Sequence, residues 1–254
     1  MQTISIYNRK GGVGKTSIVG AISAELTLHN KKILMIDSDS QANLSSQFMS
    51  KDTEFKFELA DYLYGVTNAE SIIYNTDYEN LYIIPSKTML NGGRLANWTD
   101  SESSKMENRD IVNYLIQDLQ PFNFDFIIVD MPPSYSELDK KFILASDEVI
   151  PVLQLAQSSI DGLVNFYPAL QRLKGRSTKP LCNKIIFNQF DKRKIVQKNL
   201  LQSIEKTESK KFFIPNEESF RKAEYKREAL QENDIKEPTQ DALNEIVKEL
   251  LGEN

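Results

Sequence analysis

One loop near the start of the chain carries the residues best suited to bind phosphate. Residues 10–17 read KGGVGKTS, a glycine-rich run between a short apolar stretch and a helical pattern. Glycines let backbone N–H groups approach phosphate oxygens, and a helix N-terminus adds the positive end of its dipole. Lys15 can reach the terminal phosphates of a nucleotide, and the Thr16 hydroxyl can ligate Mg²⁺. The loop therefore predicts a nucleoside triphosphate site that uses magnesium.

This loop departs from the general phosphate-loop pattern at its first position. GxxxxGK[ST] requires a glycine where this chain has Arg9. The chain instead has a lysine followed by two glycines, the KGGxGK[ST] form of a deviant Walker A loop. We expect the whole loop to contact nucleotide, through Lys10, Gly11, Gly12, Val13, Gly14, Lys15, Thr16 and Ser17.

Three acidic residues follow predicted strands. Asp37 and Asp39 come after the apolar run 32–36, and Asp130 ends the run 124–130. Because ligands of open parallel sheets bind beyond the carboxyl ends of the strands, these acids should meet the phosphate loop at one edge. Mg²⁺ keeps several waters and uses few carboxylates, which suits this set.

The element pattern favours an α/β fold, a doubly wound, mostly parallel sheet flanked by helices, in one domain over residues 1–254. Short apolar runs alternate with longer helical patterns. We expect residues 86–108, which are rich in Ser, Asn, Gly and Asp, to form a surface excursion. The predicted strands are 4–7, 32–36, 81–84, 124–130, 148–153 and 184–188, and the predicted helices are 15–29, 109–119, 194–207, 217–231 and 238–251.

Composition limits the class of protein. The 254 residues are 40% hydrophobic and 26% charged, which is ordinary for a globular domain. No apolar run approaches the roughly 18 residues of a membrane span, and the N-terminus lacks a signal-peptide pattern, so we expect a cytoplasmic protein without membrane attachment. The single Cys182 excludes an internal disulfide. The net charge is −5, yet residues 172–227 carry +10, which suggests an anionic partner for that region.

Three segments together resemble the ParA/MinD superfamily, and ParA-type partition ATPases of the short form in particular. They are KGGVGKT, ILMIDSDSQANLS at 33–45 and FIIVDMPPS at 126–134. The resemblance spans roughly residues 2–175. ParA chains usually have proline where this chain has Ser40, and Met131 is a second departure, but neither removes a group that the chemistry requires. The resemblance implies a P-loop NTPase that hydrolyses ATP to ADP with Mg²⁺.

The resemblance also implies roles for single residues. Lys10 would reach the phosphates held by the second subunit of an ATP-bound homodimer, and Asp39 would orient the attacking water; with Lys15 they form the catalytic set. Thr16, Asp37 and Asp130 would serve the metal. The adenine pocket would include Asn188, Pro215 and Asn216, the last standing where the family usually has arginine.

The family binds double-stranded DNA nonspecifically as ATP dimers, and a ParB-type, DNA-bound partner stimulates hydrolysis and releases them. The resemblance thus implies a nucleoid-associated protein that positions DNA cargo. The basic region offers phosphate contacts, which position a protein without reading sequence. The candidate DNA contacts are Lys192, Arg193, Lys194, Arg221, Lys222, Lys226 and Arg227.

The superfamily also includes proteins with other functions, which fit this sequence less well than partition. A MinD-like membrane ATPase needs a C-terminal amphipathic helix, usually basic. Residues 242–251 are amphipathic, but Glu245 and Glu249 make the polar face acidic, so we expect docking onto the core. One cysteine argues against an iron–sulfur scaffold. A metabolic ligase or kinase, and an ATP-gated protein that positions protein cargo, remain alternatives.

Overall fold

A computed structural model describes residues 1–49, 55–100, 110–204 and 208–253. Eight strands form one sheet in the order β3-β4-β2-β5-β1-β6-β7-β8. Every neighbouring pair is parallel except β3 with β4 at the edge. The strands are β1 (Gln2–Tyr7), β2 (Ile33–Asp37), β3 (Tyr74–Asn75), β4 (Leu81–Ile84), β5 (Phe126–Asp130), β6 (Glu148–Gln154), β7 (Lys184–Phe190) and β8 (Lys210–Pro215).

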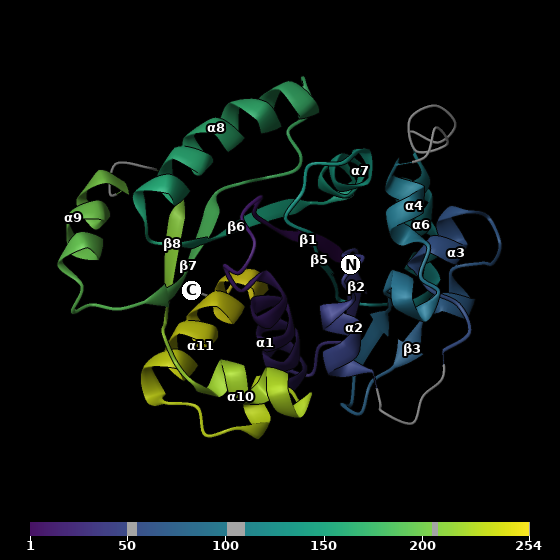
Figure 1. The fold of residues 1–254 in the computed structure, drawn as a ribbon, viewed down its shortest axis with the longest axis horizontal. Helices are drawn as coiled ribbons and strands as arrows, with labels where there is room; N and C mark the ends of the chain where they lie inside the picture. Colours follow the sequence, from purple (N-terminus) through teal and green to yellow (C-terminus); the bar gives the residue numbers. More distant parts are fainter. Residues whose placement is uncertain (50–54, 101–109, 205–207, 254) are drawn as a thin grey trace.

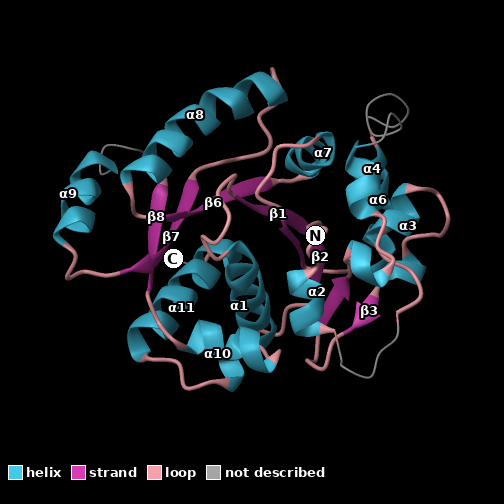
Figure 2. Ribbon diagram, viewed as in Figure 1, coloured by secondary structure: helices cyan, strands magenta, loops and turns pink. Residues whose placement is uncertain are grey.

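Helices cover both faces of this sheet, which confirms the predicted doubly wound α/β class (Figures 1 and 2). One face carries α1 (Lys15–Leu28), α2 (Asn43–Phe48), α10 (Ser219–Lys226) and α11 (Glu237–Leu251). The other carries α3 (Leu59–Leu63), α4 (Leu95–Asp100), α6 (Ile111–Asp118), α7 (Glu137–Ala145), α8 (Gln157–Lys174) and α9 (Ile195–Ile204). Short 3₁₀ turns lie at Glu70–Ile72, Met89–Asn91, Gln120–Phe122 and Leu230–Glu232.

The central strands are mostly apolar because both of their faces are covered. Successive side chains of a strand point to opposite faces. In β5, Ile128 joins the cluster under α1, whereas Ile127 and Val129 join the cluster under α6 and α7. Burial on both sides holds the strand ends, and the functional groups that follow them, in fixed register.

The six predicted strands are confirmed, but the C-terminal part of the chain differs from expectation. The predicted helix 217–231 is wrong as one element. The structure ends α10 at Lys226 because Arg227 adopts the left-handed conformation, with φ 59°. Strands β3 and β8 and helices α2, α3, α7 and α8 were not predicted from the sequence.

The expected surface excursion at 86–108 is corrected in part. Leu95 and Trp98 of α4 are only 1% and 2% exposed, and the Trp98 indole donates a hydrogen bond to the Leu63 carbonyl oxygen. The segment therefore contributes to the core. Residues 101–108 of the predicted excursion, and 205–207 of the predicted helix 194–207, lie outside the described residues.

The C-terminal helix docks onto the core, as its pattern predicted. Leu243, Ile246, Val247 and Leu250 of α11 are all buried in the cluster that includes α1 and β8. Buried Glu25 of α1 accepts hydrogen bonds from Gln240 of α11 and from Gln231. None of the described helices has the length and apolar character needed to cross a membrane.

Candidate nucleotide site

The phosphate loop joins β1 to α1 through backbone that only glycine adopts easily. Gly12 and Gly14 have φ values of 72° and 93°. A Cβ atom on Gly14 would lie 2.2 Å from Nδ2 of Asn188. That amide donates a 2.9 Å hydrogen bond to the Val13 carbonyl oxygen. Glycine is therefore required at position 14 both for conformation and for space.

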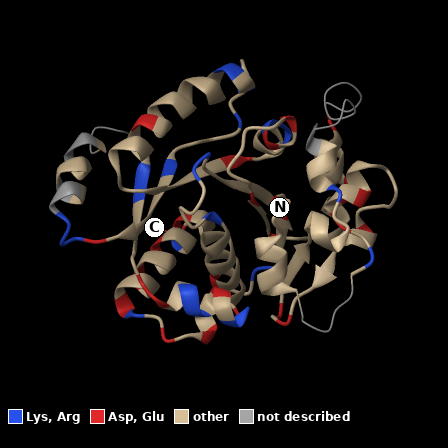
Figure 3. Ribbon diagram, in the orientation of Figure 1, with Lys and Arg blue, Asp and Glu red and all other residues tan. Residues whose placement is uncertain are grey.

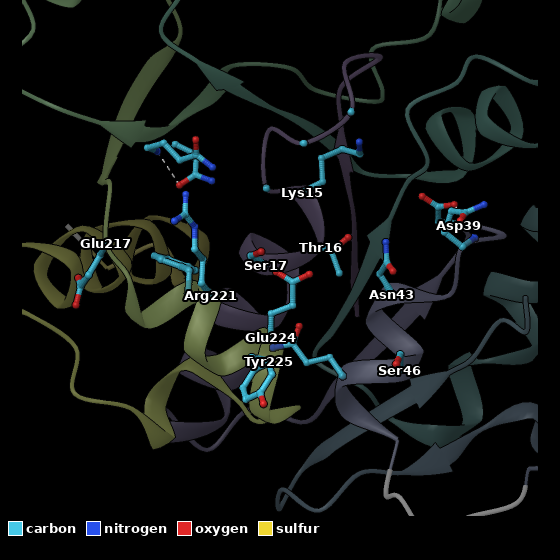
Figure 4. Close-up of a pocket in the computed structure, with 18 of the residues that line it drawn as sticks. Lys15, Thr16, Ser17, Asp39, Asn43, Ser46, Glu217, Arg221, Glu224 and Tyr225 are labelled. Atoms are coloured by element: carbon cyan, nitrogen blue, oxygen red, sulfur yellow. Dashed lines mark hydrogen bonds between the residues drawn. The ribbon is translucent and has the colours of Figure 1, made fainter.

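A cavity of about 770 Å³ opens over this loop at the carboxyl edge of the sheet (Figure 4). This size suits a nucleotide, since small-molecule sites occupy roughly 300–1,000 Å³. The end of β2 and helix α2 form one side, and the end of β8 with α10 forms the other. Lining residues include Gly11, Gly12, Gly14, Lys15, Thr16, Ser17, Asp39, Asn43, Pro133, Asn188, Pro215, Asn216, Arg221 and Arg227.

Asp130 and Asp37 lie behind this lining, directly opposite each other in the β5–β2 register. Asp130 is 1% exposed and accepts a 2.6 Å hydrogen bond from the Thr16 hydroxyl. Its Oδ1 has no hydrogen-bond partner among the described residues. Burial, and then the Asp37 carboxyl, raise the pKa of Asp130. The pair of Thr16 and an orphaned carboxylate oxygen fits the oxygen-ligand chemistry of Mg²⁺.

Asp37 is fully buried but differs from Asp130 because its own oxygens are occupied. Its Oδ2 accepts hydrogen bonds from the Ser45 backbone N–H at 2.8 Å and hydroxyl at 2.7 Å. Its Oδ1 accepts one from the Asp39 backbone at 3.1 Å. Burial raises the pKa of Asp37 to about 6. The carboxyl thereby ties the end of β2 to α2.

Lys15 lies next to the acids, and its side chain is nearly buried. Burial lowers its pKa, while the carboxylates of Asp130, Asp39 and Asp139 act in the opposite direction. Asp39 lines the cavity, and its Oδ1 accepts the Gln41 backbone N–H at 2.9 Å. The loop thus places a cation among carboxylates at the floor of the cavity.

Lys10 differs from Lys15 although both belong to the same loop. Lys10 is exposed, its backbone N–H donates to Asn8 Oδ1 at 2.9 Å, and its side chain makes no ion pair with any residue that the structure describes. Neither Lys10 nor Val13 lines the cavity. Val13 is fully buried, so only its backbone can face nucleotide.

Asn188, Pro215 and Asn216, the three residues predicted for an adenine pocket, all line this one cavity. Asn188 is 4% exposed, and its amide is already bonded to the phosphate loop. Its observed contacts therefore brace the loop.

The basic candidates form two groups rather than one (Figure 3). Lys192, Arg193 and Lys194 lie in the turn before α9, whereas the other four lie on α10 or at its end. Within the first group, Arg193 makes a two-pronged ion pair with Asp191 at 2.9 and 3.0 Å, which lowers the pKa of Asp191 to about 2.

Three of the α10-group cations differ in their neighbours. Arg221 lies 3.5 Å from Glu218, and Lys226 lies 3.6 Å from Glu228. Lys222 makes no ion pair within the described part of the chain, and neither do Lys192, Lys194 and Arg227. Among the seven candidate DNA contacts, these four are therefore the ones most free to meet an outside anion.

Several residues of the site were not predicted from the sequence. Glu224 and Tyr225 project from α10 toward the cavity, and Asn43 and Ser46 face them from α2 (Figure 4). The polar run SQANLSSQ after Asp39 was a usable signal for the α2 side. Asp139 was also missed: it is fully buried, accepts hydrogen bonds from Ser134 and Ser136, and only its capping-box spacing hinted at this.

The sheet, the glycine cradle and the lysine among carboxylates define a P-loop nucleotide hydrolase. The family model AAA_31, described as an AAA domain, matches residues 1–185. The chromosome-partitioning ATPase Soj of Treponema pallidum is 28% identical over 204 residues, which cover 80% of this chain and 77% of that protein. The sporulation initiation inhibitor protein Soj of Bacillus subtilis is 26% identical over 80% of this chain and 78% of that protein.

Solved structures show the same fold. A Borrelia burgdorferi B31 protein described as a candidate for plasmid partition, bound to AMPPNP, is 27% identical with a TM-score of 0.82, covering 100% of this chain and 99% of that chain. MinD of Pyrococcus horikoshii with Mg-ADP is 22% identical with a TM-score of 0.77, covering 98% and 95%. This chain therefore belongs to the AAA_31 family and is a ParA-type P-loop ATPase, with ATP/ADP and Mg²⁺ as its cofactors.

Proposed function

We propose that this ATPase dimerises on ATP, binds DNA nonspecifically and positions DNA cargo through a ParB-type partner that stimulates hydrolysis. The names of its relatives support partition as the process.

The phosphate loop and two buried acids would bind the phosphates and the metal. The backbone N–H groups of residues 11–16 would hold phosphate oxygens, and Lys15 would balance their charge. Thr16 and Asp130 would hold Mg²⁺, directly or through water, and the ion would stabilise charge on the phosphates. Asp37 would keep β2 and α2 in place behind this site, through its bonds to Ser45.

Asp39 would orient the attacking water. It lines the cavity, and one of its oxygens is held by the Gln41 backbone while the other accepts no hydrogen bond from the described residues. A carboxylate so fixed can accept a hydrogen bond from water without reorganising. Lys15 lies on the same side of the site and would steady the charge that develops on phosphate.

The contrast between the two lysines of the phosphate loop supports dimerisation. Lys10 is exposed, whereas Lys15 is buried. Lys10 does not line the cavity of its own chain. A cation supplied by a second subunit can act on phosphate only when the dimer exists, which would couple assembly to ATP. Cations supplied in trans contribute about 10³–10⁵ in rate in other phosphate-transfer enzymes.

Exposed, unpaired cations support the DNA part of the proposal. Lys192, Lys194 and Lys222 are free of ion pairs among the described residues and could meet phosphate directly. A membrane-associated role has less support, because the apolar stripe of α11 is buried in the core. Positioning of protein cargo is an alternative that measurements of DNA binding separate from partition.

The test is ATP hydrolysis and DNA binding of the full chain, measured in ATP and in ADP. We expect salt-sensitive binding to nonspecific duplex DNA in ATP alone, with a slope of about −0.9 per phosphate contact in log affinity against log salt. Charge reversal Lys222→Glu should weaken binding. The matched control is Arg176→Glu, an exposed cation just after α8. Hydrolysis without DNA binding in either nucleotide would discard the DNA role and favour protein cargo.

A further inference from the structure

A second cavity lies beside the phosphate loop and shares no lining residue with the nucleotide cavity. Its volume is about 180 Å³, and it opens between the ends of β1 and β6 and the underside of α8. We call it the aromatic pocket. It is lined by Tyr7, Asn8, Arg9, Tyr135, Pro151, Leu153, Gly162, Leu163, Asn165, Phe166 and Ala169.

The aromatic pocket is lined mainly by aromatic and aliphatic side chains, and two of its polar groups are already hydrogen-bonded. Tyr7 packs against Phe166 with ring centroids 5.1 Å apart and against Tyr135 at 6.4 Å. The Tyr7 hydroxyl donates to the Ser134 carbonyl oxygen at 3.0 Å, and the Asn8 amide donates to the Val152 carbonyl oxygen at 2.6 Å. An occupant therefore gains by burying apolar or aromatic surface.

The size of the pocket indicates what kind of occupant it takes. Sites for whole small molecules usually exceed about 300 Å³. A cavity of about 180 Å³ instead suits a single large side chain. Anchors of this kind, one aromatic residue in a preformed pocket, supply much of the binding energy of protein interfaces.

The charge at the mouth of the aromatic pocket indicates which residues flank the occupying side chain in its own protein. Arg9 is exposed, and its guanidinium carbon lies 5.7 Å from the Tyr135 ring centroid. Lys140 lies over the same ring at 5.2 Å, but it is paired with Glu137 at 2.5 Å. Arg9 makes no ion pair with any described residue, so it is the uncompensated charge at the mouth.

The α8 side of the mouth does not offset this charge. Asp161 accepts a hydrogen bond from Gln157 at 3.0 Å and does not line the pocket. The next residue of the phosphate loop, Lys10, adds a second exposed cation. The rim is thus positive around an aromatic interior, and carboxylates complement it.

We propose that the aromatic pocket docks one aromatic side chain from an acidic segment of a partner protein. The occupant would contact Arg9, which precedes the phosphate loop, and Tyr135, two residues after Pro133 of the nucleotide-cavity lining. The partner would thereby touch the residues next to two of the segments that line the nucleotide cavity. Docking requires no bound nucleotide, so it stands apart from the function proposed above.

The test uses the full-length protein without nucleotide and a fluorescent five-residue peptide, acetyl-Glu-Asp-Phe-Asp-Glu-amide, followed by anisotropy. We expect saturable binding that weakens about tenfold or more when the peptide phenylalanine becomes alanine, and that is lost when its four acids become lysine. Added salt should weaken binding, because the charged rim is exposed.

Two variants locate the binding site. Ala169→Phe fills the pocket with the chain's own side chain and should abolish binding, whereas Arg9→Ala should weaken it. The matched control is Val164→Phe, which adds the same ring on α8 at a position 64% exposed and outside the pocket. Val164→Phe should bind the peptide as the unmodified protein does, and Ala169→Phe should keep its basal ATP turnover.

Several outcomes would overturn the proposal. One is no saturable binding up to millimolar peptide, and another is equal binding of the phenylalanine, alanine and lysine peptides. A third is equal loss in Ala169→Phe and Val164→Phe. If pocket variants change only self-association of the chain, the pocket is an interface between copies and the acidic-partner proposal fails. Loss of ATP or DNA binding would leave this result untouched and bear only on the partition function.

Discussion

The two sides of the nucleotide cavity are built differently. On the phosphate-loop side, Lys15 and Asp130 are buried, and the Thr16 hydroxyl and the strand register fix the position of Asp130. On the α10 side, Tyr225 is 90% exposed and Arg221 makes only a 3.5 Å ion pair with Glu218. Few substitutions are tolerated where a side chain is buried and its backbone conformation is fixed. Many are tolerated where the side chain is exposed on a short helix. The first side should therefore determine the chemistry, and the second should adjust partners and affinity.

The largest effect should come from Asp39 on the phosphate-loop side. Asp39→Ala should lower ATP turnover by about 10²–10⁴-fold, because that is the usual contribution of a positioned acid or base. ATP binding should persist, since Lys15 and the loop are unchanged. The measurement is steady-state hydrolysis beside nucleotide affinity.

Asp39→Asn separates chemistry from the turn that Asp39 makes. The asparagine oxygen can still accept the Gln41 N–H, so the local backbone should be kept. We expect a loss of turnover close to that of alanine. Near-normal turnover in either variant would mean that another group orients the water and that the two sides are less distinct than proposed.

A matched pair of glycine substitutions tests the rigidity of the same side. Gly12→Ala and Gly14→Ala both place alanine at left-handed φ, which costs about 1–2 kcal/mol. Only Gly14→Ala also drives a Cβ into Asn188; the added Cβ at position 12 meets nothing within 4 Å. Gly14→Ala should therefore lower the melting temperature more and weaken ATP binding at least about tenfold more. Equal losses of melting temperature and ATP affinity in the two variants would show that the Asn188 side chain can move aside at little cost.

The sequence predicted the phosphate-loop side well because its geometry is local. The residues of 10–17 are adjacent in the chain, and Asp37 and Asp130 each end a continuous apolar strand. Parallel register then brings these two acids together without further information. The six predicted strands, including 81–84 and 184–188, were recognisable for the same reason.

The α10 side was harder to predict because it depends on contacts far apart in sequence. Helix α10 ends where the backbone of Arg227 adopts a left-handed conformation. An arginine in the sequence does not predict that conformation. Buried Glu25 fixes the chain that follows, through Gln231 and Gln240, more than 200 residues away. Asn188 could be placed at the site by resemblance, but its bond to Val13 required the structure.

The buried acids make stability depend on pH, with a smaller effect than the catalytic variants. Burial raises the pKa of Asp37 from 3.8 to about 6, so the folded state prefers the protonated carboxyl. The folded protein should then lose stability as pH rises from about 4 to 6, by roughly 3 kcal/mol at 1.36 kcal/mol per pKa unit.

Asp37→Asn removes this titration but keeps an acceptor for Ser45. Denaturant unfolding of nucleotide-free protein at pH 4, 5, 6 and 7 should show the variant gaining stability relative to the unmodified chain as pH rises. The gain should be complete near pH 7. Parallel profiles at all four pH values would show that Asp37 stays charged in the folded state at little cost.

The smallest effects should come from the exposed cations, where single residues can be compared. Lys222 on α10 makes no ion pair with the described residues, whereas Arg193 is held by both oxygens of Asp191. Removing a residue that contacts phosphate lowers the salt slope by about 1. For DNA binding in ATP, we expect Lys222→Ala to lower the salt slope in this way. Arg193→Ala should change the slope by less, since the charge of Arg193 is already compensated by Asp191. A larger change for Arg193 would mean that DNA displaces Asp191 and that the turn before α9, rather than α10, carries the contact.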